Sequence, residues 1–325
     1  YTQELYQRLE EETGQDTGFR KIGYMELAST EEWVEGFRRV ADFARYHGHV
    51  IEELSPSEIA NIWPLLKTDD LLAGFYCPDD ARVNPVDVTM ALAKGARMGG
   101  ALIFEDTKVT AINQKNGRVT GVVTEKGEIE AEYVVNCGGM WGRELGQMAG
   151  VNVPLHAAEH YYLITEPIEG IHRDLPILDD PARFAYYREE TGGLMVGLFE
   201  PVAAPWGMVK PGGLGGIPES FKFDELAPDW DRMIPHLELA MERIPVAKTA
   251  GVHKFFCGPE SFTPDLEPLM GEAPELKNYY VAAGFNSLGI LLGGGVGQVM
   301  AQWIVDGIAP IDISEVDIAR MLPFQ

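Results

Sequence analysis

A glycine-rich turn near the end of the sequence limits the fold more than any other feature. An apolar strand pattern at residues 278–282 runs into the turn at residues 283–289, and a helical pattern with Val296, Met300 and Trp303 on one face follows. Glycine lets the backbone adopt positive φ and approach a flat ligand closely. A helix N-terminus adds unpaired N–H groups and partial positive charge. The turn therefore fits a flat, electron-rich ligand, and it fits equally well a tight strand–helix connection that packs on a neighbouring element.

Two further segments carry related signals. The apolar strand pattern at residues 133–136 ends at Gly138 and Gly139, where an open α/β sheet usually binds its ligand. The proline-rich segment at residues 257–265 precedes the glycine turn and could line one face of a ring system. Taken singly, the first is also an ordinary strand–helix turn and the second an ordinary loop.

Composition and charge exclude several classes of function. The 325 residues are 46% hydrophobic and carry a formal net charge of −24, which repels phosphate backbones and argues against nucleic-acid binding. No run approaches the roughly 20 apolar residues of a membrane helix, so no transmembrane segment is expected. Three cysteines lie far apart, which suits reduced thiols in the cytoplasm or a mitochondrial matrix and gives no metal-ligand spacing.

The order of the predicted elements indicates two kinds of sheet. Asn84 and Pro85 read as the N-cap and first residue of a helix that ends at Gly99, and Ser55 begins another short helix. After the helix that begins at Asn84, the predicted strands span residues 101–104, 108–114, 118–125, 128–130 and 133–136, with a hairpin at 116–117. Alternating strands then run from 153 to about 254, interrupted by a glycine- and proline-rich loop at 203–218 and a helix near 230–243.

Taken together, the three ligand-site segments resemble the D-amino-acid-oxidase-like flavoprotein superfamily and, within it, the sarcosine and dimethylglycine dehydrogenase family. The resemblance covers essentially the whole chain, from residues 10–14 through 65–74 and 134–141 to 258–297. It implies an α/β (α+β) fold. We expect a FAD-binding Rossmann-like domain of the D-amino-acid-oxidase type that is missing its first βαβ unit, and an antiparallel-sheet substrate domain.

The resemblance also implies domain boundaries. We expect the FAD-binding domain at residues 1–17, 76–150 and 253–325, and the substrate domain at 18–75 and 151–252. In the first domain, residues 76–150 and 254–325 should form one mostly parallel sheet, with the antiparallel sheet lying over it. The sequence contains no G-x-G-x-x-G fingerprint, so these residues alone should bind FAD weakly. A histidine covalently joined to FAD and a folate-binding region, both known in the family, would lie outside this chain.

Cofactor contacts follow from the resemblance residue by residue. Lys108, Val109 and Thr110 match a strand whose backbone meets the adenine, and Gly138, Gly139 and Trp141 match a loop beside the dinucleotide. The surroundings of the isoalloxazine ring would be Thr263, Pro264, Asp265, Gly284, Asn286, Ser287, Gly289, Ile290, Leu291 and Leu292. A reduced flavin gains negative charge that the N-terminus of the last helix would stabilise. No metal ligand is implied.

His160 and Tyr186 are the catalytic residues that the resemblance implies. Histidine titrates near neutral pH, which suits removal of a proton from an amine, and a tyrosine hydroxyl can hold the amine or its carboxylate. A single histidine among aromatic residues is also common as a satisfied core residue. Leu291 stands where monomeric sarcosine oxidases have a basic residue for the substrate carboxylate, so another donor is needed. Arg188 is a candidate for that donor and is equally well explained as a surface charge.

The expected reaction is oxidative N-demethylation of a small amine such as sarcosine or dimethylglycine. Flavin accepts a hydride equivalent, the iminium hydrolyses to formaldehyde, and an electron-transfer flavoprotein takes the electrons. The alternative is a non-catalytic regulatory homologue, because residues 155–160 and 119–129 also resemble the regulatory subunit of pyruvate dehydrogenase phosphatase. Reduction of flavin by an amine would discriminate between the two.

Overall fold

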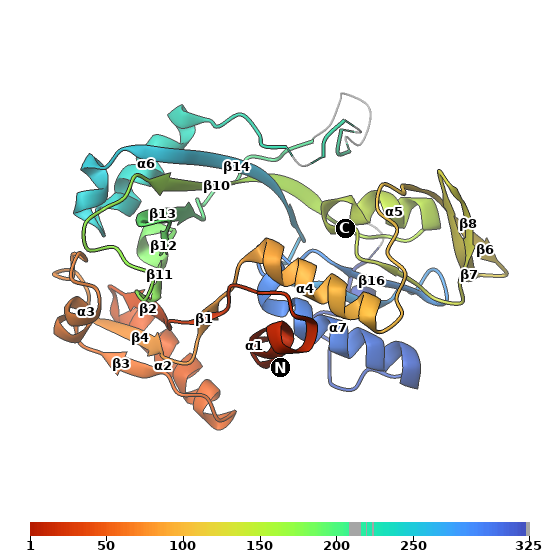
Figure 1. The fold of residues 1–325 in the computed structure, drawn as a ribbon, viewed down its shortest axis with the longest axis horizontal. Helices are drawn as coiled ribbons and strands as arrows, with labels where there is room; N and C mark the ends of the chain where they lie inside the picture. The colour runs from red at the N-terminus through yellow and green to blue at the C-terminus, as the bar shows by residue number, and fades with distance from the viewer. Residues whose placement is uncertain (208–215, 219, 223, 323–325) are drawn as a thin grey trace.

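The computed structural model describes residues 1–207, 216–218, 220–222 and 224–322 (Figure 1). Its helices are α1 (Thr2–Thr13), α2 (Glu31–Tyr46), α3 (Pro56–Ile62), α4 (Pro85–Met98), α5 (Gly142–Ala149), α6 (Trp230–Met241) and α7 (Gly289–Asp306). Within these ranges, no helix combines the length and apolar character needed to cross a membrane. The loop expected at residues 203–218 falls partly outside the described residues.

An eight-stranded sheet dominates the molecule and has the strand order β14-β10-β13-β12-β11-β2-β4-β3. Its pairs are antiparallel except for the parallel pair of β11 and β2. The strands are β2 (Tyr24–Ala28), β3 (Glu52–Leu54), β4 (Ala73–Cys77), β10 (His156–Thr165), β11 (Ile177–Asp180), β12 (Ala185–Glu190), β13 (Gly193–Leu198) and β14 (Val252–Phe262). The antiparallel sheet expected from the sequence is confirmed.

The two faces of this sheet have different surroundings. Along β12, buried and half-buried side chains alternate, as the period of two in a strand requires. Tyr187 is fully buried in the main hydrophobic core, and its hydroxyl donates a hydrogen bond of 2.7 Å to the carbonyl of Ala240 in α6. Tyr186 lies on the opposite face, which is only partly covered. This second face therefore has room for a ligand.

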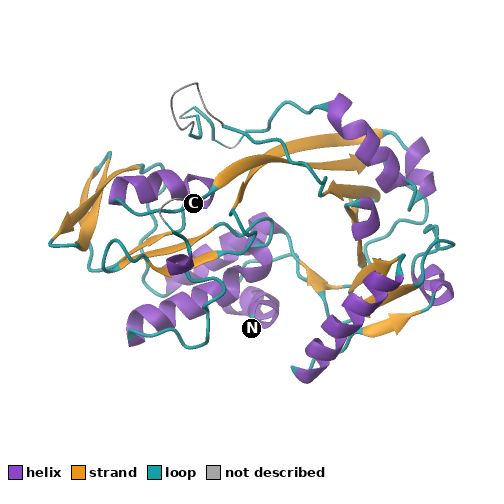
Figure 2. Ribbon diagram, turned by 180° about the vertical axis from the view of Figure 1, so that it is seen from behind, coloured by secondary structure: helices purple, strands orange, loops and turns teal. Residues whose placement is uncertain are grey.

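A smaller sheet has the order β15-β16-β9, with strands β15 (Leu269–Glu272), β16 (Tyr279–Ala283) and β9 (Val134–Asn136). Helix α7 packs on this sheet through Met300, and α1 and α4 pack beside α7 through Tyr6, Leu9 and Val88, next to Ile290. Figures 1 and 2 show the large sheet arching away from this helical layer, while the long strands β10 and β14 reach across to it.

The expectation of one mostly parallel sheet is wrong. In the small sheet, β9 and β16 pair in parallel, but β15 is antiparallel to β16. The strands β6 (Val109–Lys115), β7 (Arg118–Thr124) and β8 (Gly127–Glu130) form a separate antiparallel meander, and β1 (Arg20–Lys21) pairs with β5 (Ala81–Arg82). Residues 254–325 were expected in the mostly parallel sheet, and β14 lies almost entirely within this range. Strand β14 pairs instead with β10 in the large sheet. The domain boundaries themselves stay predictions.

The strand expected at residues 101–104 is also absent. These four residues are exposed, with Leu102 at 80%, and no strand within the described ranges pairs with them. An extended segment needs a neighbour to satisfy its backbone N–H and C=O groups before it becomes a strand. Apolar β-formers alone therefore over-predicted this element.

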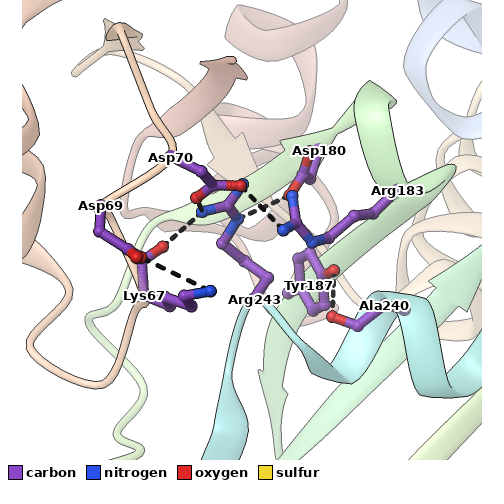
Figure 3. Close-up of polar contacts among 8 residues, drawn as sticks. All are labelled: Lys67, Asp69, Asp70, Asp180, Arg183, Tyr187, Ala240 and Arg243. Atoms are coloured by element: carbon purple, nitrogen blue, oxygen red, sulfur yellow. Dashed lines mark hydrogen bonds and ion pairs between the residues drawn. The ribbon is translucent and has the colours of Figure 1, made fainter.

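A buried charge network joins β11 of the large sheet to the loop before β4 and to α6 (Figure 3). Arg243, which follows α6, donates to Asp180 at 2.6 Å and to Asp70 at 2.7 Å, and both Arg243 and Asp180 are fully buried. Arg183 donates to the same Asp70 carboxylate at 2.8 Å. Burial raises the pKa of Asp70, but the hydrogen bonds from Arg243 and Arg183 outweigh it and lower that pKa to about 2. The network ties the loop before β4 to β11 and α6.

Candidate active site

The turn before α7 is held in an unusual backbone conformation. Gly284 has φ +70°, and a Cβ atom there would lie 2.5 Å from Cγ2 of Thr263, so only glycine fits. Asn286 and Ser287 also have positive φ, 43° and 71°. The Asn286 side chain accepts a 3.0 Å hydrogen bond from the N–H of Thr263 and donates one of 2.6 Å to the carbonyl of Leu266. The proline-rich segment is thereby held against the glycine turn.

The N-terminus of α7 can receive an electron-rich group. Leu288 occupies its N-cap and makes no side-chain hydrogen bond, and the first turn holds no acidic residue. The N–H groups of Gly289, Ile290 and Leu291 therefore have no capping side chain, and the helix dipole adds partial positive charge. These features fit the electron-rich edge of a flavin ring, which is the part of FAD that the sequence assigns to this turn.

The second glycine turn lies beside the first. Strands β9 and β16 are parallel, so their carboxyl ends meet at one edge of the small sheet. A Cβ atom on Gly142 would lie 3.4 Å from Cβ of Ala283, and both Gly142 and Gly284 face Leu155. Asn136 shapes this turn by accepting from the N–H of Gly138 and donating to the carbonyl of Gly142 at 2.7 Å.

Not every expected cofactor residue is placed equally. Asp265 accepts two hydrogen bonds from Arg320, at 2.8 and 3.0 Å, and the guanidinium lowers the pKa of Asp265 to about 2. That carboxylate is committed to structure, which leaves cofactor contact to its backbone. Lys108, Val109 and Thr110 lie at the start of the β6 meander, which packs against α5. Their contact with adenine stays a prediction, as do the cofactor roles of the other residues.

His160 and Tyr186 occupy the partly covered face of the large sheet. His160 in β10 pairs with Gly258 of β14, and Tyr186 in β12 pairs with Gly197 of β13. The Phe199 ring stands between them, with its centroid 5.1 Å from the His160 ring and 5.5 Å from the Tyr186 ring. The structure thus brings both predicted catalytic side chains to one face, separated by one phenyl ring.

Tyr186 lies in a closely packed position. A Cβ atom on Gly197 would lie 1.9 Å from Cζ of Tyr186, so the tyrosine ring rests directly over that glycine. Burial raises the pKa of Tyr186 to about 12. The hydroxyl consequently stays protonated at neutral pH and can donate a hydrogen bond to a ligand.

Glu260 connects the sheet face to the glycine turn. Its Oε2 accepts a 2.5 Å hydrogen bond from the Ser287 hydroxyl and lies 3.8 Å from Nδ1 of His160. Glu260 belongs to the proline-rich segment at residues 257–265, but no role for this residue was expected from the sequence. The available signal was a carboxyl group between Pro259 and Ser261, in the same segment as Asp265.

A cavity of about 280 Å³ opens beside this cluster. Its walls come from the sheet, from the second glycine turn and from the segment before α6, and they consist of Met140, His160, Phe221, Asp224, Phe256, Gly258, Pro259 and Glu260. Tyr186 lies outside the lining. No group of three His, Cys, Asp or Glu side chains suited to a metal ion occurs among the described residues.

Comparison with known proteins identifies the family. The family model described as "FAD dependent oxidoreductase" matches residues 1–303. The chain belongs to this FAD-dependent oxidoreductase family. The family assignment and the fold class expected from the sequence are both confirmed.

Three curated relatives of this flavoprotein cover nearly the whole chain. Mitochondrial sarcosine dehydrogenase from Mus musculus is 39% identical over 98% of the chain. The mitochondrial pyruvate dehydrogenase phosphatase regulatory subunit of Mus musculus is 37% identical over 98%. A formaldehyde-forming 4-methylaminobutanoate oxidase from Paenarthrobacter nicotinovorans is 36% identical over 98%. The chain spans only 34%, 36% and 38% of these three proteins, respectively.

A solved structure has the same fold. L-proline dehydrogenase from P. horikoshii superposes with a TM-score of 0.84 at 27% identity, covering 98% of this chain and 81% of that protein. The overall fold described above is therefore shared with this solved structure.

Two carboxyl groups that the sequence did not indicate share a face of the large sheet with Tyr186. Asp179 in β11 pairs with Tyr186 on one side and with Glu26 of β2 on the other. The Tyr24 hydroxyl donates to Glu26 at 2.5 Å, and its oxygen lies 3.2 Å from a carboxyl oxygen of Asp179. Burial raises the pKa of Glu26 to about 7 and that of Asp179 to about 6. Only strand pairing brings these residues together, so their spacing in the sequence gives no signal.

Replacing Glu26 with glutamine should make the flavoprotein more stable at pH 8. The pKa values of Glu26 and Asp179 rise on folding, so the folded chain binds more protons than the unfolded chain between about pH 4 and 7. The free energy of unfolding of the wild type should therefore fall as pH rises through this range. At pH 8, Glu26→Gln should gain roughly 1–3 kcal/mol, since it needs no desolvated charge and still accepts from Tyr24.

Urea denaturation at pH 5 and pH 8 measures this effect. Glu11→Gln is the matched control, because Glu11 is exposed on α1 and should change the free energy of unfolding little at either pH. An unchanged pH dependence in Glu26→Gln would contradict the interpretation.

Proposed function

We propose that this flavoprotein oxidatively removes a methyl group from a small N-methyl amine such as sarcosine or dimethylglycine. The observation that carries the proposal is the position of His160 beside the cavity, with Glu260 joining it to the glycine turn before α7. An imidazole that can take a proton thus lies close to the turn that fits a flavin edge. The names of the sarcosine dehydrogenase and of the formaldehyde-forming oxidase support the same reaction class.

Different residues of this chain would have different roles in the proposed reaction. The N–H groups at the start of α7 and the turn at Gly138 and Gly139 would hold the cofactor. When bound, FAD would supply the acceptor for the hydride that leaves the methyl carbon of the substrate. His160 takes the proton from the substrate ammonium, because only the neutral amine has the lone pair that assists hydride loss. Tyr186 donates a hydrogen bond to the substrate. Water then adds to the iminium product, which yields the demethylated amine and formaldehyde.

Electrons leave the reduced protein to an electron-transfer flavoprotein in this proposal. Arg188 stays the candidate that binds a substrate carboxylate. Its Nε already donates to Sδ of Met195 at 3.2 Å and one terminal nitrogen pairs with Glu190 at 2.9 Å. A substrate carboxylate would have to compete with Glu190 for this guanidinium.

A regulatory role without amine oxidation is the second candidate. It is favoured by the 37% identity to the phosphatase regulatory subunit, nearly the same as the identity to the sarcosine dehydrogenase. The two candidates differ in one property, because only an amine oxidoreductase reduces its flavin when a substrate amine is added.

Anaerobic addition of an N-methyl amine should bleach the yellow absorbance of FAD and release formaldehyde. FAD is supplied in excess, because these residues alone are expected to bind FAD weakly. Sarcosine, dimethylglycine and 4-methylaminobutanoate form the substrate panel. Glycine is the control, since it has no methyl group to lose. Absence of bleaching with every amine would favour the regulatory role.

A further inference from the structure

Glu260 is placed to control the protonation pattern of a single histidine. Its Oε2 lies 3.8 Å from Nδ1 of His160, and the exposed fractions of the two side chains are only 24% and 17%. Both residues line the cavity. The Phe199 ring packs at 44° to the imidazole with a centroid distance of 5.1 Å, which restricts rotation of the His160 ring.

We propose that Glu260 is a positioning residue that holds neutral His160 as its Nδ1–H tautomer. At 3.8 Å the contact is longer than a hydrogen bond, but the carboxylate charge favours the tautomer that has its hydrogen on the nitrogen that faces Glu260. The lone pair of neutral His160 then lies on Nε2, which becomes the proton acceptor. This role rests on the proposed function, in which His160 takes a proton from the substrate ammonium.

Ser287 connects the Glu260–His160 pair to the glycine turn. Its hydroxyl donates to the same Oε2 of Glu260 at 2.5 Å, and its φ of +71° is unfavourable for a residue with a side chain. Strained backbone persists where surrounding contacts over-determine it, and such positions cluster at functional sites. The turn that would hold the flavin therefore also fixes the carboxylate that orients His160. One segment would thus position both the flavin and His160.

Histidine tautomers can be measured directly by ¹⁵N NMR in the chain without FAD. With ¹⁵N-labelled histidine, assigned through a His160→Gln sample, wild-type His160 should be mainly the Nδ1–H tautomer at about pH 8.5, where ordinary histidine is neutral. Glu260→Ala should shift the population toward the Nε2–H form that imidazole prefers in water. Glu166→Ala is the matched control, because Glu166 follows the end of β10, lies 3.6 Å from the exposed His253 in β14, and should leave His160 unchanged.

A wild-type His160 that is mainly Nε2–H, or a Glu260→Ala variant with an unchanged tautomer, would overturn the proposal. Should Glu260→Ala fail to fold, Ser287→Gly supplies the test. Glycine keeps the positive φ and removes the hydroxyl, so the Nδ1–H fraction should fall. An unchanged fraction in Ser287→Gly would then count against the proposal.

Amine-dependent flavin reduction separates this proposal from the proposed function. Glu260→Ala should lower kcat by about 10²-fold, with a smaller change in KM, since a misplaced acid/base group affects the proton transfer more than binding. If no amine reduces wild-type protein while the tautomers follow the expectation, the positioning role stands and the proposed function fails. If amines reduce the flavin but the His160 tautomer is unchanged in Glu260→Ala, the proposed function stands and the positioning role fails.

Discussion

Replacing Tyr186 with phenylalanine should slow flavin reduction by sarcosine or dimethylglycine by about 10²–10⁴-fold, the usual worth of a positioned acid/base group. Tyr186→Phe keeps the ring that rests over Gly197 and removes only the hydroxyl. Because burial raises the pKa of Tyr186 to about 12, this hydroxyl is still a hydrogen-bond donor at assay pH. His160→Ala should slow the reaction comparably, since no other histidine is among the described residues that line the cavity.

Anaerobic stopped-flow reduction in the presence of excess FAD measures both variants. The neighbouring Tyr187 offers a matched control, because it faces the opposite side of the sheet and donates to Ala240 in the core. Tyr187→Phe should lower the free energy of unfolding by about 1 kcal/mol and leave the reduction rate unchanged. If wild type is reduced and both site variants match it, the family assignment stands and these two residues are not the catalytic pair.

Replacing Arg243 with methionine should lower the free energy of unfolding by about 3–5 kcal/mol. Asp180 is fully buried and would lose its 2.6 Å hydrogen bond from Arg243, while Asp70 would lose one of its two guanidinium partners. Arg183 still donates to Asp180 at 3.3 Å, but loss of the shorter bond from Arg243 leaves the buried Asp180 charge only weakly compensated, and breaking a buried ion pair costs far more than the pair contributes. Urea denaturation at pH 7 measures the change.

An exposed pair provides the control for Arg243. Arg38 donates to both carboxylate oxygens of Glu53, at 2.8 and 2.6 Å, and both side chains are largely in water. Arg38→Met should therefore cost only about 0–1 kcal/mol. Equal losses in the two variants would show that the buried network does not hold the loop before β4 in place.

The same network predicts sensitivity to acid. The pKa of Asp70 is about 2 in the folded chain, below its ordinary value of 3.8. Its contribution to stability is therefore present above about pH 4 and lost as pH falls toward 2. Arg243→Met should weaken this dependence, because Arg243 is one of the two groups that lower the pKa.

Local chemistry in the sequence determined the type and the ends of many elements. Asn84 caps α4 by accepting from the N–H groups of Val86 and Asp87, and Ser55 with Glu58 forms the capping box of α3. The glycine turn before α7 was also readable, because positive φ at Gly284 needs glycine whatever packs around it. These features depend on residues within a few positions of one another, so a single sequence suffices to predict them.

Tertiary structure alone decided which strands are neighbours. Apolar alternation fixes which face of a strand is buried but not the strand that pairs with it. For that reason β14 was placed with the wrong sheet, and the residues 101–104 were predicted as a strand although nothing within the described ranges pairs with them. Pairing also brought Asp179 between Glu26 and Tyr186, and it carried Glu260 to His160, a hundred positions away. The raised carboxyl pKa values and the Glu260–His160 contact arise from such long-range neighbours, so the physical cause of both lies in the packing of distant segments.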